Sequence, residues 1–275
     1  MQRCWRRMLE SDYQTRFGGL GRLLSTDALQ RLSKAHACVI GVGGVGSWTV
    51  EALARSGIGE LTLIDLDEVC VSNVNRQIHA LEGAIGRPKV QVMAERARAI
   101  APGLKVNEAA VFYTRDNADE VLNDRFDMVV DAIDSGQLKA HLIGTCRRRG
   151  LPIMTCGGAG GRKDASRVKV TDLGRASGDP LLAKVRRELR THFGFPKYAG
   201  KRFGVPCVYS DEPPRFPWAD GRVCAQREPG SDVGLNCEEG MGTAAWVTGT
   251  IGLIAAQVAI EAIVSPEPHS PKSAR

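Results

Sequence analysis

A glycine-rich turn restricts the fold of this chain more than any other feature of its sequence. The turn lies between the apolar run 37–42 and a helical pattern that ends near Gly57, and a second apolar run follows at 60–65. Its glycines are Gly41, Gly43, Gly44 and Gly46. A strand, a glycine turn, a helix and a second strand in this order predict a parallel βαβ unit. Because glycines let the backbone approach an anion at a helix N-terminus, the turn indicates nucleotide binding, without deciding between NAD and ATP.

The same alternation continues along the chain. Further helices are predicted at 26–34, 88–102, 116–124, 137–150 and 179–190, and further strands at 105–112, 126–134, 151–156 and 167–173. Residues 194–236 are rich in proline, glycine and charge, and we interpret them as long loops. The pattern predicts an α/β fold, a Rossmann-like, doubly wound, mostly parallel sheet with a C-terminal extension of helix and loops. We expect one domain, made of a helical arm (1–35), a nucleotide-binding core (36–175) and the extension (176–275).

Composition narrows the class of protein. Of the 275 residues, 43% are hydrophobic and 25% charged, which excludes a disordered chain, and the net charge of +6 is compatible with an anionic partner. None of the eight cysteines forms a C-x-x-C pair, which argues against a zinc ribbon or a thioredoxin motif. The first residues contain no apolar signal segment, so we expect an intracellular protein with reduced thiols.

One segment has the length of a membrane span. Residues 241–260 carry no charge over about 20 residues, the span of a bilayer. The segment nevertheless contains Gly242, Gly249, Gly252 and Gln257. We therefore predict a helix that is buried in the fold or in a subunit interface, and not a membrane helix.

Residues beyond the second strand favour a triphosphate over a dinucleotide. Asp65 ends that strand, where an acid can bind a ribose. Arg76 and Lys89 follow, and a dehydrogenase needs neither cation there, whereas phosphate oxygens accept from both. Asp134 ends the predicted strand 126–134 at the same edge of the sheet, where a carboxylate suits Mg²⁺ on a triphosphate. An oxidoreductase is therefore disfavoured.

These residues resemble a known family. The segments are VIGVGGVGSWTVEALARSGIGELTLIDLDEVCVSNVNRQIHA, GRPKVQVMAERARAIAP and VVDAIDS, and they are similar to the ThiF/MoeB/HesA family of ubiquitin-activating-like adenylating enzymes. The resemblance runs from about residue 16 to residue 264. Within the family, RFGGLGRL, CRRRGLPIMTCGGAGG and CEEGMGTAA resemble the branch that modifies tRNA.

The resemblance implies an activity and partners. It implies ATP-dependent dehydration of threonylcarbamoyladenosine beside the tRNA anticodon to its cyclic form, through an acyl-adenylate, with Mg²⁺ as cofactor. It also implies a cytoplasmic homodimer whose extension faces the tRNA, with a cysteine desulfurase or another sulfur-transfer protein as a further partner. The alternative is adenylation of the C-terminus of a sulfur-carrier or ubiquitin-like protein. Relatives of that kind often hold zinc through two C-x-x-C pairs, and this chain has none.

The resemblance also assigns roles to residues of the site. The four glycines correspond to the phosphate turn and Asp65 to the ribose acid. The residues that hold and polarise the triphosphate correspond to Asp67, Asn73, Arg76 and Lys89, and Asp134 corresponds to the aspartate on the Mg²⁺ side. Many relatives add an arginine from the partner subunit, and Arg16 and Arg22 both remain open for this role.

Four further features bear on the chemistry. Cys237 corresponds to a reactive cysteine of relatives, but its two acidic neighbours raise the expected pKa of its thiol, so a structural role stays open. His79 is predicted to be a packing or hydrogen-bonding residue, and Cys156 a core residue. Basic residues between 184 and 202, interleaved with Tyr198 and Phe203, resemble a track for a phosphate backbone.

Overall fold

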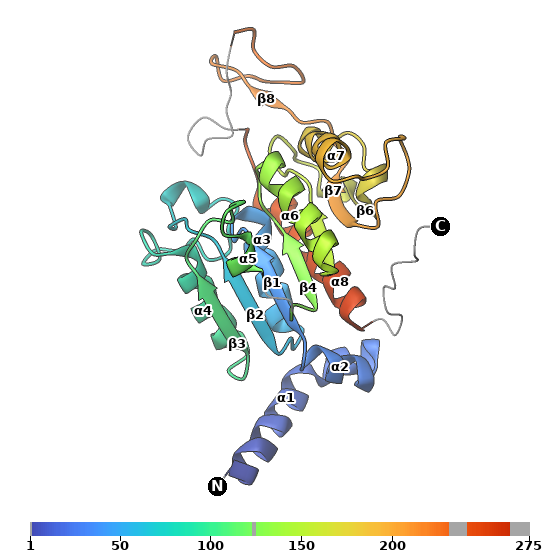
Figure 1. The fold of residues 1–275 in the computed structure, drawn as a ribbon. Helices are drawn as coiled ribbons and strands as arrows, with labels where there is room; N and C mark the ends of the chain where they lie inside the picture. The colour runs from blue at the N-terminus through green and yellow to red at the C-terminus, as the bar shows by residue number, and fades with distance from the viewer. Residues whose placement is uncertain (1, 123–124, 231–240, 265–275) are drawn as a thin grey trace, which may run out of the picture.

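The computed structural model describes residues 2–122, 125–230 and 241–264, with side chains from residue 12 onward. A seven-stranded sheet forms its centre, in the order β3-β2-β1-β4-β5-β7-β6 (Figure 1). The strands are β1 (His36–Ile40), β2 (Glu60–Ile64), β3 (Lys105–Ala109), β4 (Met128–Asp131), β5 (Ile153–Cys156), β6 (Val168–Asp172) and β7 (Pro206–Ser210). All neighbouring pairs are parallel except β6 with β7, so the predicted mostly parallel α/β sheet is confirmed.

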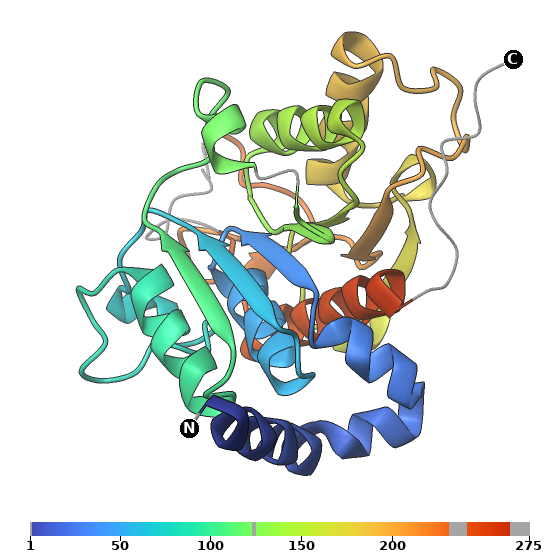
Figure 2. The same cartoon turned by 60° about the horizontal axis from the view of Figure 1, so that its bottom comes forward.

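Helices cover both faces of the sheet. The helices are α1 (Gln2–Leu24), α2 (Thr26–Leu32), α3 (Gly44–Arg55), α4 (Lys89–Ile100), α5 (Ala118–Val121), α6 (Gly136–Arg149), α7 (Pro180–His192) and α8 (Ala245–Val264). Figure 2 shows α3, α4 and α8 on one side of the sheet and α6 with α7 on the other. A two-stranded hairpin of β8 (Phe216–Pro217) and β9 (Val223–Cys224) lies outside the sheet. Both faces are therefore buried, as a parallel sheet requires.

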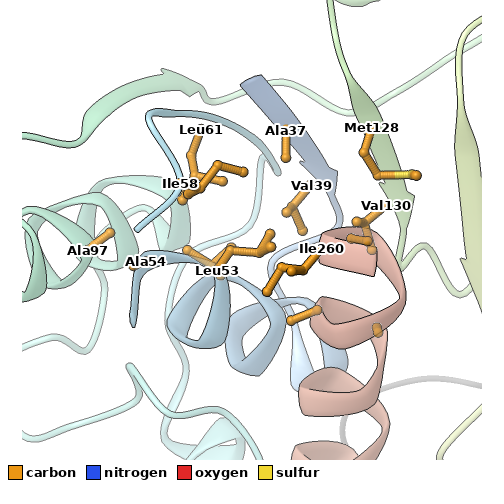
Figure 3. Close-up of a cluster of buried hydrophobic side chains, with 14 of the residues drawn as sticks. Ala37, Val39, Leu53, Ala54, Ile58, Leu61, Ala97, Met128, Val130 and Ile260 are labelled. Carbon is orange, nitrogen blue, oxygen red and sulfur yellow. The ribbon is translucent and has the colours of Figure 1, made fainter. Parts of the chain in front are cut away.

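Two apolar clusters fill the space between the layers. The cluster beneath α3, α4 and α8 takes Val39 and Val130 from the strands, Leu53 from α3 and Ile260 from α8 (Figure 3). The opposite cluster takes the alternate strand residues, among them Ile40, and packs them on α6 and α7. Successive residues of β1 thus point to opposite faces, and both faces are apolar, which explains why this strand reads as a continuous hydrophobic run.

The N-terminal arm lies at the end of the sheet that is opposite to the glycine turn. The Tyr13 hydroxyl donates to the carbonyl oxygen of Gly57, at 2.6 Å, where the chain enters β2. Helix α2 begins at a cap in which Ser25 Oγ accepts from the N–H of Ala28. Residues of the arm therefore meet the amino ends of the strands, away from the carboxyl ends where ligands bind in such folds (Figure 1).

The interpretation of residues 194–236 as long loops was wrong for three strands, β7 and the short pair β8 and β9. Residues 206–210 form β7, which pairs with β5 on one side and with β6 on the other. The sheet therefore extends beyond the segment 36–175 that we expected to contain the core. Helix α8, also in the extension, packs on α3 and on the sheet.

Helix α8 is the apolar segment that raised the question of a membrane span. Within the described part of the chain it is the one helix long and apolar enough to cross a bilayer, and 56% of its most hydrophobic window is buried inside the fold. Its contact with α3 is close, because a Cβ at Gly252 would lie 2.5 Å from the carbonyl oxygen of Val45. Thr49 Oγ1 donates to the carbonyl oxygen of Gly252, at 3.1 Å. Cover by α3 and the sheet accounts for the apolar residues on this side of the helix.

The two helix glycines that face α3 give a matched test of this packing. We expect Gly252→Ala to lower the free energy of unfolding by about 1–3 kcal/mol, because its Cβ would also lie 2.7 Å from Trp48 Cβ. At Gly249 the nearest atom, in the Trp48 ring, is 3.5 Å away, and Gly249→Ala should be neutral or stabilising by up to about 1 kcal/mol. Urea unfolding at equal protein concentrations measures both. Equal losses in the two variants would contradict a close contact at Gly252.

Candidate active site

The glycine turn joins β1 to α3 with no room for side chains at two positions. A Cβ at Gly46 would lie 1.8 Å from the carbonyl oxygen of Gly41, which no residue but glycine avoids. Gly41 itself has φ of 88°, and a Cβ there would lie 2.8 Å from the carbonyl oxygen of Ala132. The first turn of α3 is thereby pressed against the end of β1, with its N–H groups open toward the carboxyl edge of the sheet.

Buried polar atoms without a partner lie beside this turn. Ser47 Oγ, in the first turn of α3, and Gln77 Oε1 make no hydrogen bond to any described residue, although both side chains are buried. Gln77 Nε2 lies 3.9 Å from the position of a Cβ on Gly43. Such groups are costly to bury unless something completes their hydrogen bonds. Ser47 Oγ can donate to a phosphate oxygen at this helix N-terminus, whereas Gln77 Oε1 only accepts and suits an N–H or O–H group of a ligand.

Asp65 connects the end of β2 to the glycine turn. Its Oδ2 accepts from the N–H of Val42 at 2.7 Å, and its Oδ1 accepts from the N–H of Asp67 at 2.9 Å. Burial raises the pKa of Asp65, while the Lys89 charge and the two backbone donors act in the opposite direction. An ionised carboxylate has about four acceptor sites, so two remain for further donors such as ribose hydroxyls.

Lys89 is buried and paired. Its Nζ lies 2.7 Å from Asp67 Oδ2, and its side chain is 7% exposed, whereas that of Asp67 is 50% exposed. Helix α4 begins at Lys89, directly after Pro88, and the Lys89 N–H donates to the carbonyl oxygen of Asp67. Two contacts between the same two residues therefore fix the ammonium group beside the end of β2. Its charge also acts on Asp65.

Asn73 holds the crossover segment that precedes α4. Its Oδ1 accepts from the N–H of Cys70 at 3.1 Å, at the start of a short 3-10 turn (Val71–Asn73). The residue is 1% exposed. In the described structure this side chain shapes the backbone on which Arg76 sits.

Arg76 is positioned through its backbone. Its carbonyl oxygen accepts from Trp48 Nε1 at 3.1 Å and from Thr248 Oγ1 at 3.0 Å, so α3 and α8 both hold this residue. Its side-chain stem passes over the turn, 3.7 Å from the position of a Cβ on Gly44. The guanidinium Nη1 donates to the carbonyl oxygen of Ser72 and to Asn75 Oδ1. Arg76 therefore lies beside the phosphate turn with its head group bound to its own loop.

Asp134 lies at the carboxyl end of β4, next to the turn. The residue is exposed, and the loop that carries it begins at Ala132, whose carbonyl group approaches Gly41. Behind the loop, the Asp131 and Lys139 side chains form an ion pair of 3.0 Å, and both are fully buried. Lys139 Nζ also donates to the carbonyl oxygen of Asp131, and Thr155 Oγ1 donates to Asp131 Oδ2. These contacts fix the backbone that leads to Asp134.

The arrangement fits a magnesium ion that is held chiefly by a nucleotide. No group of three or more His, Cys, Asp or Glu side chains in the described ranges could hold a metal ion. Mg²⁺ needs no such cage, because it is usually bound by one or two carboxylates, water and substrate phosphates. Asp134 is an exposed carboxylate on the loop that packs against Gly41, and it pairs with no cation among the described ion pairs, unlike Asp67, which is held by Lys89.

Other predicted residues lie elsewhere. Arg16 and Arg22 are on α1, at the opposite end of the sheet, and Arg16 pairs with Asp12 at 2.7 Å. Cys237 lies outside the described residues. Cys156 is 1% exposed in β5, and burial raises the pKa of its thiol to about 12, as expected of a core residue.

His79 is enclosed near the site. It is 1% exposed, and neither ring nitrogen has a hydrogen-bond partner among the described residues. Burial, together with the charges of Lys89 and Arg96, lowers its pKa to about 4. The ring is therefore neutral at pH 7 and packs without hydrogen bonds to the residues that the structure describes.

Comparison with known proteins agrees with this geometry. The model of the ThiF family matches residues 18–274, which is nearly the whole chain. The chain belongs to the ThiF family. Among relatives, it is 45% identical to tRNA threonylcarbamoyladenosine dehydratase of Escherichia coli, over 94% of this chain and 97% of the relative, and 45% identical to the protein of the same name of Haemophilus influenzae, over 92% and 95%. The crystal structure of the Escherichia coli enzyme in complex with ATP superposes with a TM-score of 0.79 at 44% identity, over 91% of this chain and 94% of that one.

The sequence did not reveal every residue of this ThiF-family site. Gln77 belongs to the quoted family segment that ends in NRQIHA. Its position beside Gly43 depends on how the chain between β2 and α4 folds back onto the glycine turn. Trp48 and Thr248 support Arg76 from helices that are far apart in the chain. Lys139 could have been suspected, because a lysine in a predicted helix that follows an aspartate-bearing strand can reach back to it.

Two glycine variants distinguish a glycine that the fold requires from a glycine that we expect to be required for ligand binding. At Gly43 the nearest atom that a Cβ would meet, among the described residues beyond its chain neighbours, is Gln77 Nε2 at 3.9 Å. We expect Gly43→Ala to keep its free energy of unfolding and to bind ATP at least tenfold more weakly, because the methyl group would project toward the ligand. Gly46→Ala, which clashes with Gly41, should lose stability as well. Calorimetric titration with ATP and urea unfolding measure the two effects, and unchanged ATP affinity in Gly43→Ala would contradict the site.

Proposed function

We propose that this chain catalyses the ATP-dependent dehydration of threonylcarbamoyladenosine beside a tRNA anticodon to its cyclic form. The observation that carries the proposal is the likeness to tRNA threonylcarbamoyladenosine dehydratases over nearly the full length of both chains. The glycine turn, Arg76, Lys89 and Asp134 supply the chemistry that activation of a carboxylate by ATP requires. Release of pyrophosphate in the presence of bulk tRNA tests it directly.

The reaction needs activation because a free carboxylate is a poor electrophile. A carboxylate oxygen of the substrate attacks the α-phosphorus of ATP, and pyrophosphate leaves with the electron pair of the broken P–O bond. The carbamoyl group of the same substrate then attacks the acyl-adenylate carbonyl, a proton is lost and AMP leaves. The carboxylate oxygen departs with AMP, so the net change in the nucleoside is the loss of one water. Ring closure is intramolecular, and well-oriented reactions of this kind reach effective molarities on the order of 10⁵ M.

The side chains act on the charge that develops in the first step. Lys89, held by Asp67, presents a fixed positive charge next to the turn. Arg76 must release the carbonyl of Ser72 and extend its guanidinium to phosphate oxygens, with which it can form two parallel hydrogen bonds. Asp65 would bind the ribose, and Asp134 would hold Mg²⁺. When bound, Mg²⁺ neutralises part of the negative charge on the phosphates.

The partner is a tRNA, and basic residues on one side of the site suit it. These basic residues are Lys184, Arg186, Arg187, Arg190, Lys197, Lys201 and Arg202. Lys184, on α7, runs beside the start of α6, because its Cδ lies 3.0 Å from the position of a Cβ on Gly136. This basic stretch thus begins next to the loop of Asp134, and phosphate groups contribute most of the affinity in such contacts.

We also propose a cytoplasmic homodimer. A side of α8 carries exposed Trp246 and Leu253, which a second subunit would cover. Arg16 or Arg22 would then approach the site of the partner subunit from α1, because within one chain α1 lies at the other end of the sheet. A sulfur-transfer protein such as a cysteine desulfurase remains a proposed partner.

The alternative activity is adenylation of the C-terminus of a sulfur-carrier or ubiquitin-like protein. Both reactions begin with attack of a carboxylate on ATP and use the same turn. The missing C-x-x-C pairs and the basic stretch favour RNA. Pyrophosphate release with a carrier protein but not with bulk tRNA would favour the alternative.

Three variants test the roles at the triphosphate. We expect Arg76→Ala, Lys89→Ala and Asp134→Ala each to lower tRNA-dependent pyrophosphate release by at least about 100-fold, because each removes a charge that acts on the developing phosphate charge. Lys34→Ala, an exposed lysine at the amino end of the sheet, is the control and should keep full activity. Circular dichroism checks the fold. Near wild-type turnover in any of the three would remove that residue from the proposed site.

Cys237→Ser distinguishes direct ring closure from a thioester route. Because the substrate carries its own nucleophile and Glu238 and Glu239 disfavour a thiolate, we expect activity to fall by less than about tenfold. A required thioester would instead abolish cyclised product while exchange between ATP and pyrophosphate continued. Both quantities are measured on one preparation, and exchange without any product would exclude direct closure.

A further inference from the structure

A small aromatic and basic hairpin stands apart from the sheet. Strands β8 and β9 pair Phe216 with Cys224 and Pro217 with Val223, and the turn between them contains Gly221 at φ of 85°. The N–H of Trp218 donates to the carbonyl oxygen of Arg222 at 2.8 Å. In Figure 1 the hairpin extends beyond α6 and α7, at the end of the molecule opposite to α1. Pairing between the two strands therefore gives this segment a defined conformation outside the main sheet.

Each aromatic ring of the hairpin carries an arginine. The Arg222 guanidinium carbon lies 4.9 Å from the centre of the Trp218 ring, and that of Arg227 lies 5.2 Å from the centre of the Phe216 ring. Trp218 Nε1 donates to the carbonyl oxygen of Gln226 at 3.0 Å, which fixes the orientation of the indole. Both arginines are exposed. The hairpin therefore presents two aromatic rings, each with an exposed guanidinium over it, and one of the rings is fixed by a hydrogen bond.

The two acids of the hairpin are engaged within it. Asp220 pairs with Arg222 at 2.7 Å and accepts from the N–H of the same residue. Glu228 Oε2 accepts from the N–H of Ala219 at 3.0 Å. These contacts hold the turn and one guanidinium in place. Together with Arg215 and Arg227, the segment 215–228 has three cations against two carboxylates, which gives it a net positive charge.

The base of the hairpin is joined to the edge of the sheet that carries the site. The N–H of Arg215 donates to the carbonyl oxygen of Gly161 at 2.8 Å, in the loop that follows β5. A Cβ at Gly161 would lie 2.6 Å from the carbonyl oxygen of Arg215, so the two segments are in direct contact. The next strand in the sheet, β4, carries Asp134 at its carboxyl end. The hairpin thus projects from the same edge as the nucleotide site.

We propose that the β8–β9 hairpin binds unpaired bases of the RNA substrate by stacking on Trp218, Phe216 and their arginines. The proposal rests on the proposed function and adds to it the surface that receives the loop of the tRNA. Proteins recognise RNA loops by stacking splayed bases on aromatic rings and on guanidinium planes, since the bases of a duplex are not accessible. A base-paired stem offers phosphates and minor-groove groups to the hairpin, but no free base face on which an aromatic ring could stack. The hairpin therefore selects single-stranded RNA. The bases that it binds are those that neighbour the modified adenosine in the tRNA loop.

The experiment uses two RNAs of equal length, one a stem with a seven-base loop and one a fully paired duplex. Dissociation constants are measured by fluorescence anisotropy for the full-length chain and for Trp218→Ala, Trp218→Phe and Arg227→Gln. We expect Trp218→Ala to weaken loop binding about tenfold or more, in the range of a lost base–aromatic stack, and to leave duplex binding unchanged. Trp218→Phe keeps a ring and should retain most of the affinity. Lys34→Gln is the control for loss of one charge.

The outcomes separate this proposal from the proposed function. Affinity for ATP without RNA should be the same in every variant, and the KM for tRNA should rise in Trp218→Ala while kcat changes little. Loop binding by Trp218→Ala equal to that of the unaltered chain, or equal losses on loop and duplex, would overturn the stacking surface. The stacking surface would also be overturned if a hairpin variant kept its RNA affinity but lost binding to a carrier protein. The hairpin would then serve a protein partner. Absence of tRNA-dependent pyrophosphate release in the unaltered chain would reject the proposed function, whereas loop binding by the hairpin is measured independently.

Discussion

The contact between Gly41 and Gly46 is the constraint on which the rest of the structure depends. It brings the end of β1 and the start of α3 so close that a single Cβ at Gly46 would lie 1.8 Å from a carbonyl oxygen. The closeness directs the N–H groups of the first turn of α3 toward the carboxyl edge of the sheet. It also leaves space for the loop after β4 to pack on Gly41, and for Asp65 to bind Val42 from β2. The glycine turn, Asp65 and the loop of Asp134 are thus neighbours because three parallel strands end at one tight turn.

Helix α8 both covers the apolar core and contacts the backbone of the candidate site. The first three turns of α8 carry no charged residue, which would be unusual for a helix on a protein surface. Much of the helix is instead covered by α3 and the sheet. The same helix donates from Thr248 to the carbonyl oxygen of Arg76, and the segment before it accepts from Asn75 at Thr243. Movement of α8 relative to α3 would therefore shift the backbone of the residue that is proposed to bind phosphate. The apolar packing that closes one face of the core thus also positions the backbone of Arg76.

Local patterns predicted most of the fold and the position of the turn, because helices and buried strands each have a period that can be read over a few residues. Strand β7 escaped this reading. It has five residues, begins at Pro206 and lies in a segment rich in turn-forming residues, and its partners Thr155 and Val170 are distant in sequence. Support for Arg76 was equally hidden, since Thr248 approaches it only after the whole sheet has formed. Contacts that tertiary packing creates leave no periodic trace in the sequence.

Two loops at the carboxyl ends of the strands, those after β4 and β5, each contact a buried ion pair. Asp131 and Lys139 are fully buried, and Arg162 and Asp179 nearly so, with a distance of 3.1 Å in the second pair. Desolvation offsets most of the attraction in such pairs, so an apolar pair of equal volume would give similar stability. An apolar pair could not bind the loop backbone, however. Lys139 donates to the carbonyl oxygen of Asp131, Asp131 accepts from the N–H of Ile133, and Asp179 accepts from the N–H of Gly158. Each pair therefore fixes peptide groups whose positions decide where Asp134 and the base of the hairpin lie, and this orientation, more than stability, accounts for charge at these buried places.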